Sequence, residues 1–246
     1  DHRDLHSFPT RRSSDLPLGR WTQWAVSRGA DNVMMVQWLY LQNHDESLLE
    51  LASLIESQSF NWSEWMGNRD WVIWAAFYQG QDNWMHRHGV NVGMGIKSPA
   101  INYQRTGDEK YLKSLKTGFT DLMNLHGLPN GVFSADEDLH GNNPVQGTEL
   151  CAIVESMYSL EEAAAITGDA TYLDALERMA FNALPSQTTD DYNAKQYFQV
   201  ANQVQISKGV FNFTLPFERE MTNVLGMRSG YTCCLANMHQ GWPKFV

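Results

Sequence analysis

The sequence predicts an all-α fold built from helical hairpins in tandem. A unit of about sixty residues recurs along the chain, and each copy combines turn residues with apolar residues at helical spacing. Hydrophobic residues make up 43% and charged residues 19% of the 246 residues. This composition is typical of a globular protein and excludes a disordered or low-complexity chain.

Residues 1–16 differ from the remainder of the chain. They are polar, show no apolar period and contain no apolar core of a secretory signal. The segment resembles a translated sequencing adapter, so we expect it to be non-native; the alternative is a disordered native tail. We expect residues 17–246 to be one partial helical domain, a fragment of a longer protein.

The two clearest copies of the repeat lie 61 residues apart, at Tyr103–Leu115 and Ala164–Leu176. Both contain Thr-Gly-Asp followed by Tyr-Leu and a further Leu. The glycine suits the left-handed residue that ends a helix, and the aspartate can cap the next helix. A weaker copy at Asn43–Leu49 has Asp45 in the aspartate position. Stacked hairpins of this kind form either an open α-solenoid or a closed toroid. Six of them would need about 360 residues.

A different pattern interrupts the helices near residues 190–215. Gln196–Ile206 is rich in strand-forming residues and follows a polar loop. We therefore expect a short β or loop excursion there.

Charge and hydropathy exclude several classes of partner. The formal charge is −10 and no cluster of Lys and Arg is present, which argues against nucleic-acid binding. No apolar run approaches the roughly 20 residues that cross a bilayer, so we expect no membrane insertion. Compartment and oligomeric state stay open.

All three cysteines fall in two short motifs, Gly-Thr-Glu149-Leu-Cys151 and Cys233-Cys234-Leu-Ala-Asn237. One carboxylate and three thiols make a plausible four-coordinate zinc set. The alternatives are three ordinary buried cysteines or a vicinal disulfide between Cys233 and Cys234.

Shared binding of one ion would restrict the backbone at both motifs. Residues two apart on a regular helix point about 200° apart, so Glu149 and Cys151 require a loop or the irregular first turn of a helix. We expect the adjacent cysteines to lie on irregular backbone for the same reason.

Two further polar clusters are candidates. Asp136, Glu137 and Asp138 lie between glycine-rich stretches, either as a general acid/base site or as a solvated acidic turn. His86 and His88 either contact a sugar or are hydrogen-bonded core groups. The nine tryptophans either stack on sugar rings or fill helix–helix seams.

Together the Glu-x-Cys motif, the Asp136-Glu137 pair and the Cys-Cys-x-x-Asn motif followed by Met-His-Gln-Gly-Trp-Pro-Lys-Phe resemble the β-L-arabinofuranosidase family, glycoside hydrolase family 127 and its relatives. The resemblance implies an (α/α)6 toroid of helical hairpins, incomplete in this chain, followed in the family by β-sandwich domains. It implies Zn2+ bound by Glu149, Cys151, Cys233 and Cys234.

The resemblance also implies the roles of residues in a retaining glycoside hydrolase that removes L-arabinofuranose-type sugars from an oligosaccharide or glycan. Cys233 would be the zinc-bound nucleophile, and Glu137 the acid/base, with Asp136 as the fallback. Glu149 would complete the catalytic group. Contacts to substrate would come from His88, Asp136 and Asn237.

Three alternatives remain. The first is a metal-free hydrolase or lyase on the same toroid that uses Asp136 or Glu137. The second is a non-catalytic carbohydrate-binding helical repeat in which zinc only stabilises the fold. The third is an inactive fragment of a parent enzyme.

Overall fold

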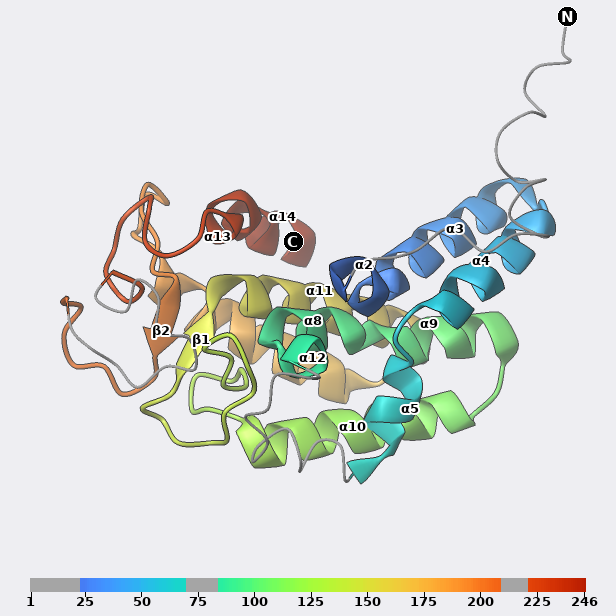
Figure 1. Cartoon of the computed structure of the whole chain (residues 1–246), viewed down its shortest axis with the longest axis horizontal. Helices are drawn as coiled ribbons and strands as arrows, with labels where there is room; N and C mark the ends of the chain where they lie inside the picture. Colours follow the sequence, from blue (N-terminus) through green and yellow to red (C-terminus); the bar gives the residue numbers. More distant parts are fainter. Residues whose placement is uncertain (1–22, 70–83, 209–220) are drawn as a thin grey trace, which may run out of the picture.

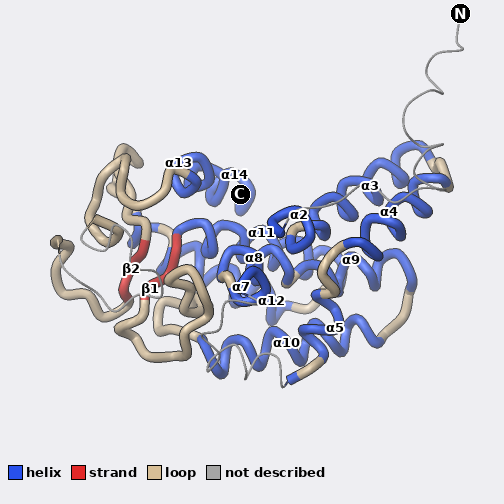
Figure 2. Tube along the Cα trace, viewed as in Figure 1, coloured by secondary structure: helices blue, strands red, loops and turns tan. Residues whose placement is uncertain are grey.

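The structure is a computed structural model that describes residues 23–69, 84–208 and 221–246. The predicted all-α class is confirmed, since helices dominate these residues (Figures 1 and 2). None of the described helices has the length and apolar character that crossing a bilayer requires. The expectation for residues 1–16 lies outside the described residues. The helices are α2 (Gln23–Ser27), α3 (Gly29–Asn43), α4 (Ser47–Gln58), α5 (Trp62–Gly67), α7 (Trp84–Arg87), α8 (Gly89–Gly95), α9 (Lys97–Thr106), α10 (Lys110–His126), α11 (Leu150–Thr167), α12 (Ala170–Arg178), α13 (Cys233–Asn237) and α14 (Gly241–Phe245).

The sixty-residue repeat forms three helical hairpins, α3–α4, α9–α10 and α11–α12, which confirms the predicted unit. In each hairpin the first helix ends on a left-handed residue. Gly107 and Gly168 both have φ of 69°, and His44 occupies the same position in the weaker copy with φ of 57°. Left-handed backbone is least costly for glycine, which explains why the two clearest copies carry one.

The aspartate of each copy binds the start of the second helix. Asp169 is the N-cap residue of α12, whereas Asp45 and Asp108 lie one residue before the N-caps of α4 and α10. Its carboxylate accepts a hydrogen bond from the backbone N–H two residues later, at 2.9–3.0 Å in all three hairpins. The acceptors are Asp45, Asp108 and Asp169, and the donors are Ser47, Lys110 and Thr171. The same aspartate-to-backbone hydrogen bond therefore recurs along the chain. It satisfies backbone N–H groups that have no acceptor within the helix.

Gly168→Ala is expected to lower the free energy of unfolding by about 1–2 kcal/mol, because an L side chain strains the left-handed backbone. A Cβ at this position would meet no atom within 4 Å, so the loss reports the backbone alone. Urea denaturation measures it, with Gly168→Asn as the milder control. An unchanged unfolding midpoint for the alanine variant would contradict the assigned turn.

Helix α11 lies at the centre of the core and packs against α8, α9 and α12 (Figure 1). It is apolar on most of its surface because it is covered on several sides. Leu150, Ala152, Ile153 and Leu160 are all fully buried. The long buried helix gives a rigid support for whatever its N-terminal turn carries.

A two-stranded antiparallel ribbon stands at the N-terminus of α11. Strand β1 (Gly147–Glu149) pairs with β2 (Phe198–Val200) (Figure 2). In this pairing Glu149 lies opposite Phe198. Strand β2 falls within the predicted excursion at 190–215, of which residues 209–215 lie outside the described residues. Because β1 runs directly into α11, the ribbon fixes Glu149 at the head of the central helix.

Candidate active site

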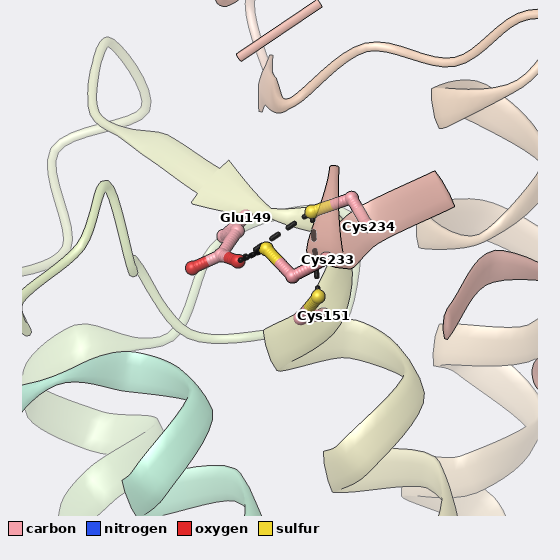
Figure 3. A group of neighbouring side chains, drawn as sticks. All are labelled: Glu149, Cys151, Cys233 and Cys234. Carbon is pink, nitrogen blue, oxygen red and sulfur yellow. Dashed lines mark hydrogen bonds between the residues drawn. The ribbon is translucent and has the colours of Figure 1, made fainter. Parts of the chain in front are cut away.

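Glu149 and the three cysteines meet at one point, although 82 residues separate the two motifs. The sulfurs of Cys151 and Cys234 lie 3.4 Å apart. Oε1 of Glu149 lies 3.4 Å from the Cys234 sulfur and 3.6 Å from the Cys233 sulfur (Figure 3). All four ligand atoms lie within 4.8 Å of one another. The structure thus brings together the four residues that the sequence proposed as a metal site.

The backbone explains how each motif presents two side chains to one point. Glu149 has extended backbone, with φ of −68° and ψ of 138°, and Cys151 lies in the first turn of α11, as predicted. The expected irregular backbone at the cysteine pair is wrong, because Cys233 and Cys234 are the first two residues of α13. Adjacent helical residues diverge by only about 100°, so both sulfurs can converge at the end of the helix.

Two of the sequence alternatives for the cysteines do not match this arrangement. All three cysteines are free, so there is no vicinal disulfide. Cys151 and Cys234 are buried, but Cys233 is exposed. The cluster therefore combines one exposed cysteine with two buried ones.

The cluster crowds four acidic groups, and their pKa values shift accordingly. Burial, followed by the charge of Glu137, raises the pKa of Glu149 well above its usual value. A hydrogen bond to Cys233 raises the pKa of Cys151, and burial raises that of Cys234. Hydrogen bonds from Cys151 and Cys234 lower the pKa of Cys233 to about 2. These directions favour ionisation at Cys233 and disfavour it at the other three groups, where a bound cation would be needed to keep them ionised.

The donor set fits a zinc ion. Zinc–sulfur bonds of about 2.3 Å in a tetrahedron place neighbouring ligand atoms about 3.8 Å apart, close to the observed 3.4–3.6 Å. Oε2 of Glu149 is buried without a hydrogen-bond partner, and Nε2 of His88 lies 3.9 Å from it, so this oxygen can still accept a ligand bond. Thiolate ligands favour zinc over magnesium or calcium.

A cavity of about 650 Å³ opens beside the cluster. Its walls combine the acidic and thiol groups of the cluster with aromatic and amide side chains. They are formed by Trp24, Arg28, His88, Val90, Met94, Glu137, Glu149, Cys151, Glu155, Tyr197, Tyr231, Cys233, Ala236, Asn237 and Gln240. A purely structural metal site would be closed to substrate, so the open cavity argues against the scaffold alternative.

Glu137 lines the same cavity and is held at both carboxyl oxygens. The Tyr197 hydroxyl donates to Oε1 at 2.7 Å, and Nε2 of His88 lies 3.0 Å from Oε2. The Glu137 backbone is left-handed, with φ of 80°, and its carbonyl accepts from the Gly89 N–H at 2.6 Å. Such backbone costs about 1–3 kcal/mol for a residue other than glycine and is concentrated at functional sites.

The pairing of the 134–138 loop with β1 brings Glu137 beside Glu149. The Ala135 N–H donates to the Gly147 carbonyl, and the Glu149 N–H donates to the Ala135 carbonyl, both at 2.9 Å. One oxygen each from Glu137 and Glu149 lies within 4.8 Å of the other and of a His88 nitrogen. The two carboxyl groups thus share one wall of the cavity.

The remaining predicted site residues divide between the cavity and the interior. Asn237 lines the cavity, where its Nδ2 donates to Oε1 of Glu155 at 3.1 Å. Asp136 is fully buried outside the cavity lining, and its carboxylate lies 3.1 Å from Nδ1 of His140. Glu137, His88 and Asn237 therefore line the cavity, whereas Asp136 is buried outside its lining.

Other cavity residues were not predicted from the sequence. Tyr197 lies in the strand-forming segment, where an aromatic residue is expected to be part of the core. No local sequence pattern indicates its contact with Glu137. Trp24 and Tyr231 belong to no motif with a chemical signature. Arg28 is a single charge in the turn between α2 and α3, and Glu155 is a single charge on α11. Two of the tryptophans considered for sugar stacking, Trp62 and Trp65, are buried in the core.

Comparison with known proteins agrees with this geometry. A family model for the beta-L-arabinofuranosidase GH127 catalytic domain matches residues 19–246. A solved GH127 beta-arabinofuranosidase is 19% identical, with a TM-score of 0.56 over 87% of this chain and 32% of that one. A solved glycoside hydrolase is also 19% identical, with a TM-score of 0.54 over 87% of this chain and 38% of that one. The chain thus shares their fold and spans well under half the length of either. No curated protein matches it at a significant level.

Proposed function

The chain belongs to the beta-L-arabinofuranosidase GH127 family, and from this premise we propose that residues 17–246 are part of the helical-toroid catalytic domain of a retaining glycoside hydrolase. The proposed substrate is a glycan or oligosaccharide that carries L-arabinofuranose-type sugars. The observation that carries the proposal is the accessible Cys233 thiol, which shares one cavity with Glu137.

The proposed metal site holds one zinc ion on Glu149, Cys151, Cys233 and Cys234. When bound, zinc supplies the positive charge that keeps several thiols ionised in a buried place, and it stabilises sulfur as a leaving group. The short separations between the donors, and the lack of a hydrogen bond at Oε2 of Glu149, support this assignment.

In the first proposed step the Cys233 sulfur bonds to the anomeric carbon while the glycosidic bond breaks. Glu137 donates a proton to the departing oxygen. Because the Tyr197 hydroxyl already occupies Oε1, Oε2 is the oxygen that carries this proton. Nε2 of His88, 3.0 Å away, orients that oxygen.

In the second step Glu137 accepts a proton from a water molecule that attacks the same carbon. The carbon–sulfur bond breaks and the Cys233 thiolate returns. Two displacements at one carbon retain its configuration. Asn237 and His88, at the wall of the cavity, are the proposed contacts to sugar hydroxyls.

A second candidate uses Glu149 as the nucleophile and no metal. It is favoured by the closeness of Glu149 to Glu137, since retaining enzymes of the usual type place two carboxyl groups about 5–5.5 Å apart. Burial opposes it, because it raises the pKa of Glu149 and a nucleophilic carboxylate has to be ionised.

The metal content of the purified protein separates the two candidates. We expect about one zinc per chain after dialysis, and loss of hydrolysis with recovery on zinc readdition after chelation. Cys151→Ser should bind zinc more weakly, although it leaves the Cys233 sulfur in place. Full hydrolytic activity in metal-free protein would contradict the proposed thiolate mechanism and leave the carboxylate pair.

A further inference from the structure

Lys195 is a buried cation whose recorded partners are neutral groups. Its side chain has no exposed surface. The ammonium donates to the carbonyl of Ser229 and, at 3.2 Å, to the carbonyl of Tyr231. It lies 5.3 Å from the centre of the Tyr197 ring. No carboxylate is recorded in an ion pair with Lys195 within the described ranges, so carbonyl oxygens and a ring face replace water around a buried charge.

The two carbonyls belong to the turn that leads directly into the cysteine pair. Gly230 lies between them with φ of 59°. A Cβ on Gly230 would stand 2.2 Å from Cγ of Tyr197, so the turn is pressed against that ring where only glycine fits. The Ser229 hydroxyl also accepts from the Tyr197 N–H at 3.2 Å. Lys195 therefore binds a turn that is in close contact with Tyr197 and ends two residues before Cys233.

Tyr197 links Lys195 and the 229–231 turn to Glu137, the proposed acid/base. Its hydroxyl donates to Glu137, and its ring packs edge-on against Tyr231 at 5.8 Å between centres. The ammonium of Lys195 thus contacts both the residue that holds the acid/base and the turn that carries the nucleophile.

We propose that Lys195 is a positioning residue that fixes the 229–231 turn against Tyr197. It thereby holds the Cys233 sulfur and the Glu137 carboxylate at the relative position that the reaction requires. This inference rests on the proposed function for its effect on catalysis. It assigns Lys195 no contact with substrate, because Lys195 does not line the cavity.

The chain offers a matched control in Lys97, a second lysine with no exposed surface. Its ammonium pairs with Asp31 at 2.6 Å and lies outside the cavity lining. Lys195→Met and Lys97→Met each remove one buried ammonium and keep most of the side-chain volume. A general effect of losing a buried lysine would appear in both variants.

We expect Lys195→Met to lower kcat about 10–100-fold, because a displacement of about 1 Å is sufficient for such a loss, while KM changes little. Lys97→Met should lose stability and keep its kcat per folded molecule. Lys195→Arg, which retains a cation able to donate to both carbonyls, should recover much of the loss. Equal kcat values in Lys195→Met and Lys97→Met would overturn the proposal.

Hydrogen exchange of the purified protein tests the positioning role without any assay of hydrolysis. Lys195→Met should speed exchange at residues 229–237 selectively, and Lys97→Met should not. Gly230→Ala is a second route to the same effect, since it displaces the turn and leaves Lys195 in place. Unchanged exchange in both Lys195→Met and Gly230→Ala would contradict the inference. An unsubstituted protein without hydrolytic activity would instead contradict the proposed function.

Discussion

Cys233→Ser is expected to reduce glycoside hydrolysis by about 10⁴-fold or more, the usual loss when the nucleophile of a covalent mechanism is removed. The hydroxyl is a far weaker nucleophile and the sulfur–carbon bond cannot form. Steady-state hydrolysis of an aryl arabinofuranoside measures the loss. The melting temperature of the variant shows whether the fold is intact.

The same mechanism predicts an adduct on one sulfur. In Glu137→Gln the second step lacks its base, so an activated aryl glycoside should leave one sugar bound to Cys233, identified by peptide mass spectrometry. Cys233 is the exposed thiol of the three, and the buried Cys151 and Cys234 should stay unlabelled. Near-normal turnover by Cys233→Ser, or a sugar attached to Glu149, would favour the carboxylate alternative.

Glu137→Gln is expected to slow hydrolysis of natural glycans by about 10²–10⁴-fold, the range that general acid–base catalysis contributes. Cleavage of an aryl glycoside should be affected much less in its first step, because the aryl oxide leaves without a proton. A burst of released aryl alcohol followed by slow turnover would show this difference. Azide, which needs no base, should restore the second step.

Asp136→Asn is the matched control, since it removes the neighbouring carboxylate and the same charge. Its carboxylate contacts His140 rather than the cavity. We expect nearly unchanged turnover per folded molecule and a lower melting temperature. If Asp136→Asn were the variant with the large loss and the azide rescue, Asp136 would be the acid/base and the assignment of Glu137 would be wrong.

The hairpins were predictable because their turns are local. Gly107 with Asp108, and Gly168 with Asp169, fix a left-handed residue and a cap within two positions. The copy at His44 was harder to recognise, since histidine adopts the same backbone at greater cost. Strand β1 could not be predicted, because three residues form a strand only through pairing with β2 far along the chain.

The sequence identified those site residues whose side-chain type by itself indicates the chemistry. It did not identify residues that act through their position in the fold. Thiols and carboxylates in short motifs indicated Glu149, Cys151 and the cysteine pair. Tyr197 and Lys195 act through tertiary contacts, which no spacing encodes. The choice between Asp136 and Glu137 depends on which neighbour faces the cavity; the cavity lining includes Glu137 and not Asp136, which favours Glu137 as the proposed acid/base.

Because Cys151 begins α11 and the cysteine pair begins α13, the proposed zinc ion would be a removable cross-link between these two helices. Bound zinc would close a loop of about eighty residues, and in the chain-entropy treatment a covalent link of that span stabilises by about 4.5 kcal/mol. Chelation would then release the C-terminal segment first, while the hydrophobic interior around α11 stays folded.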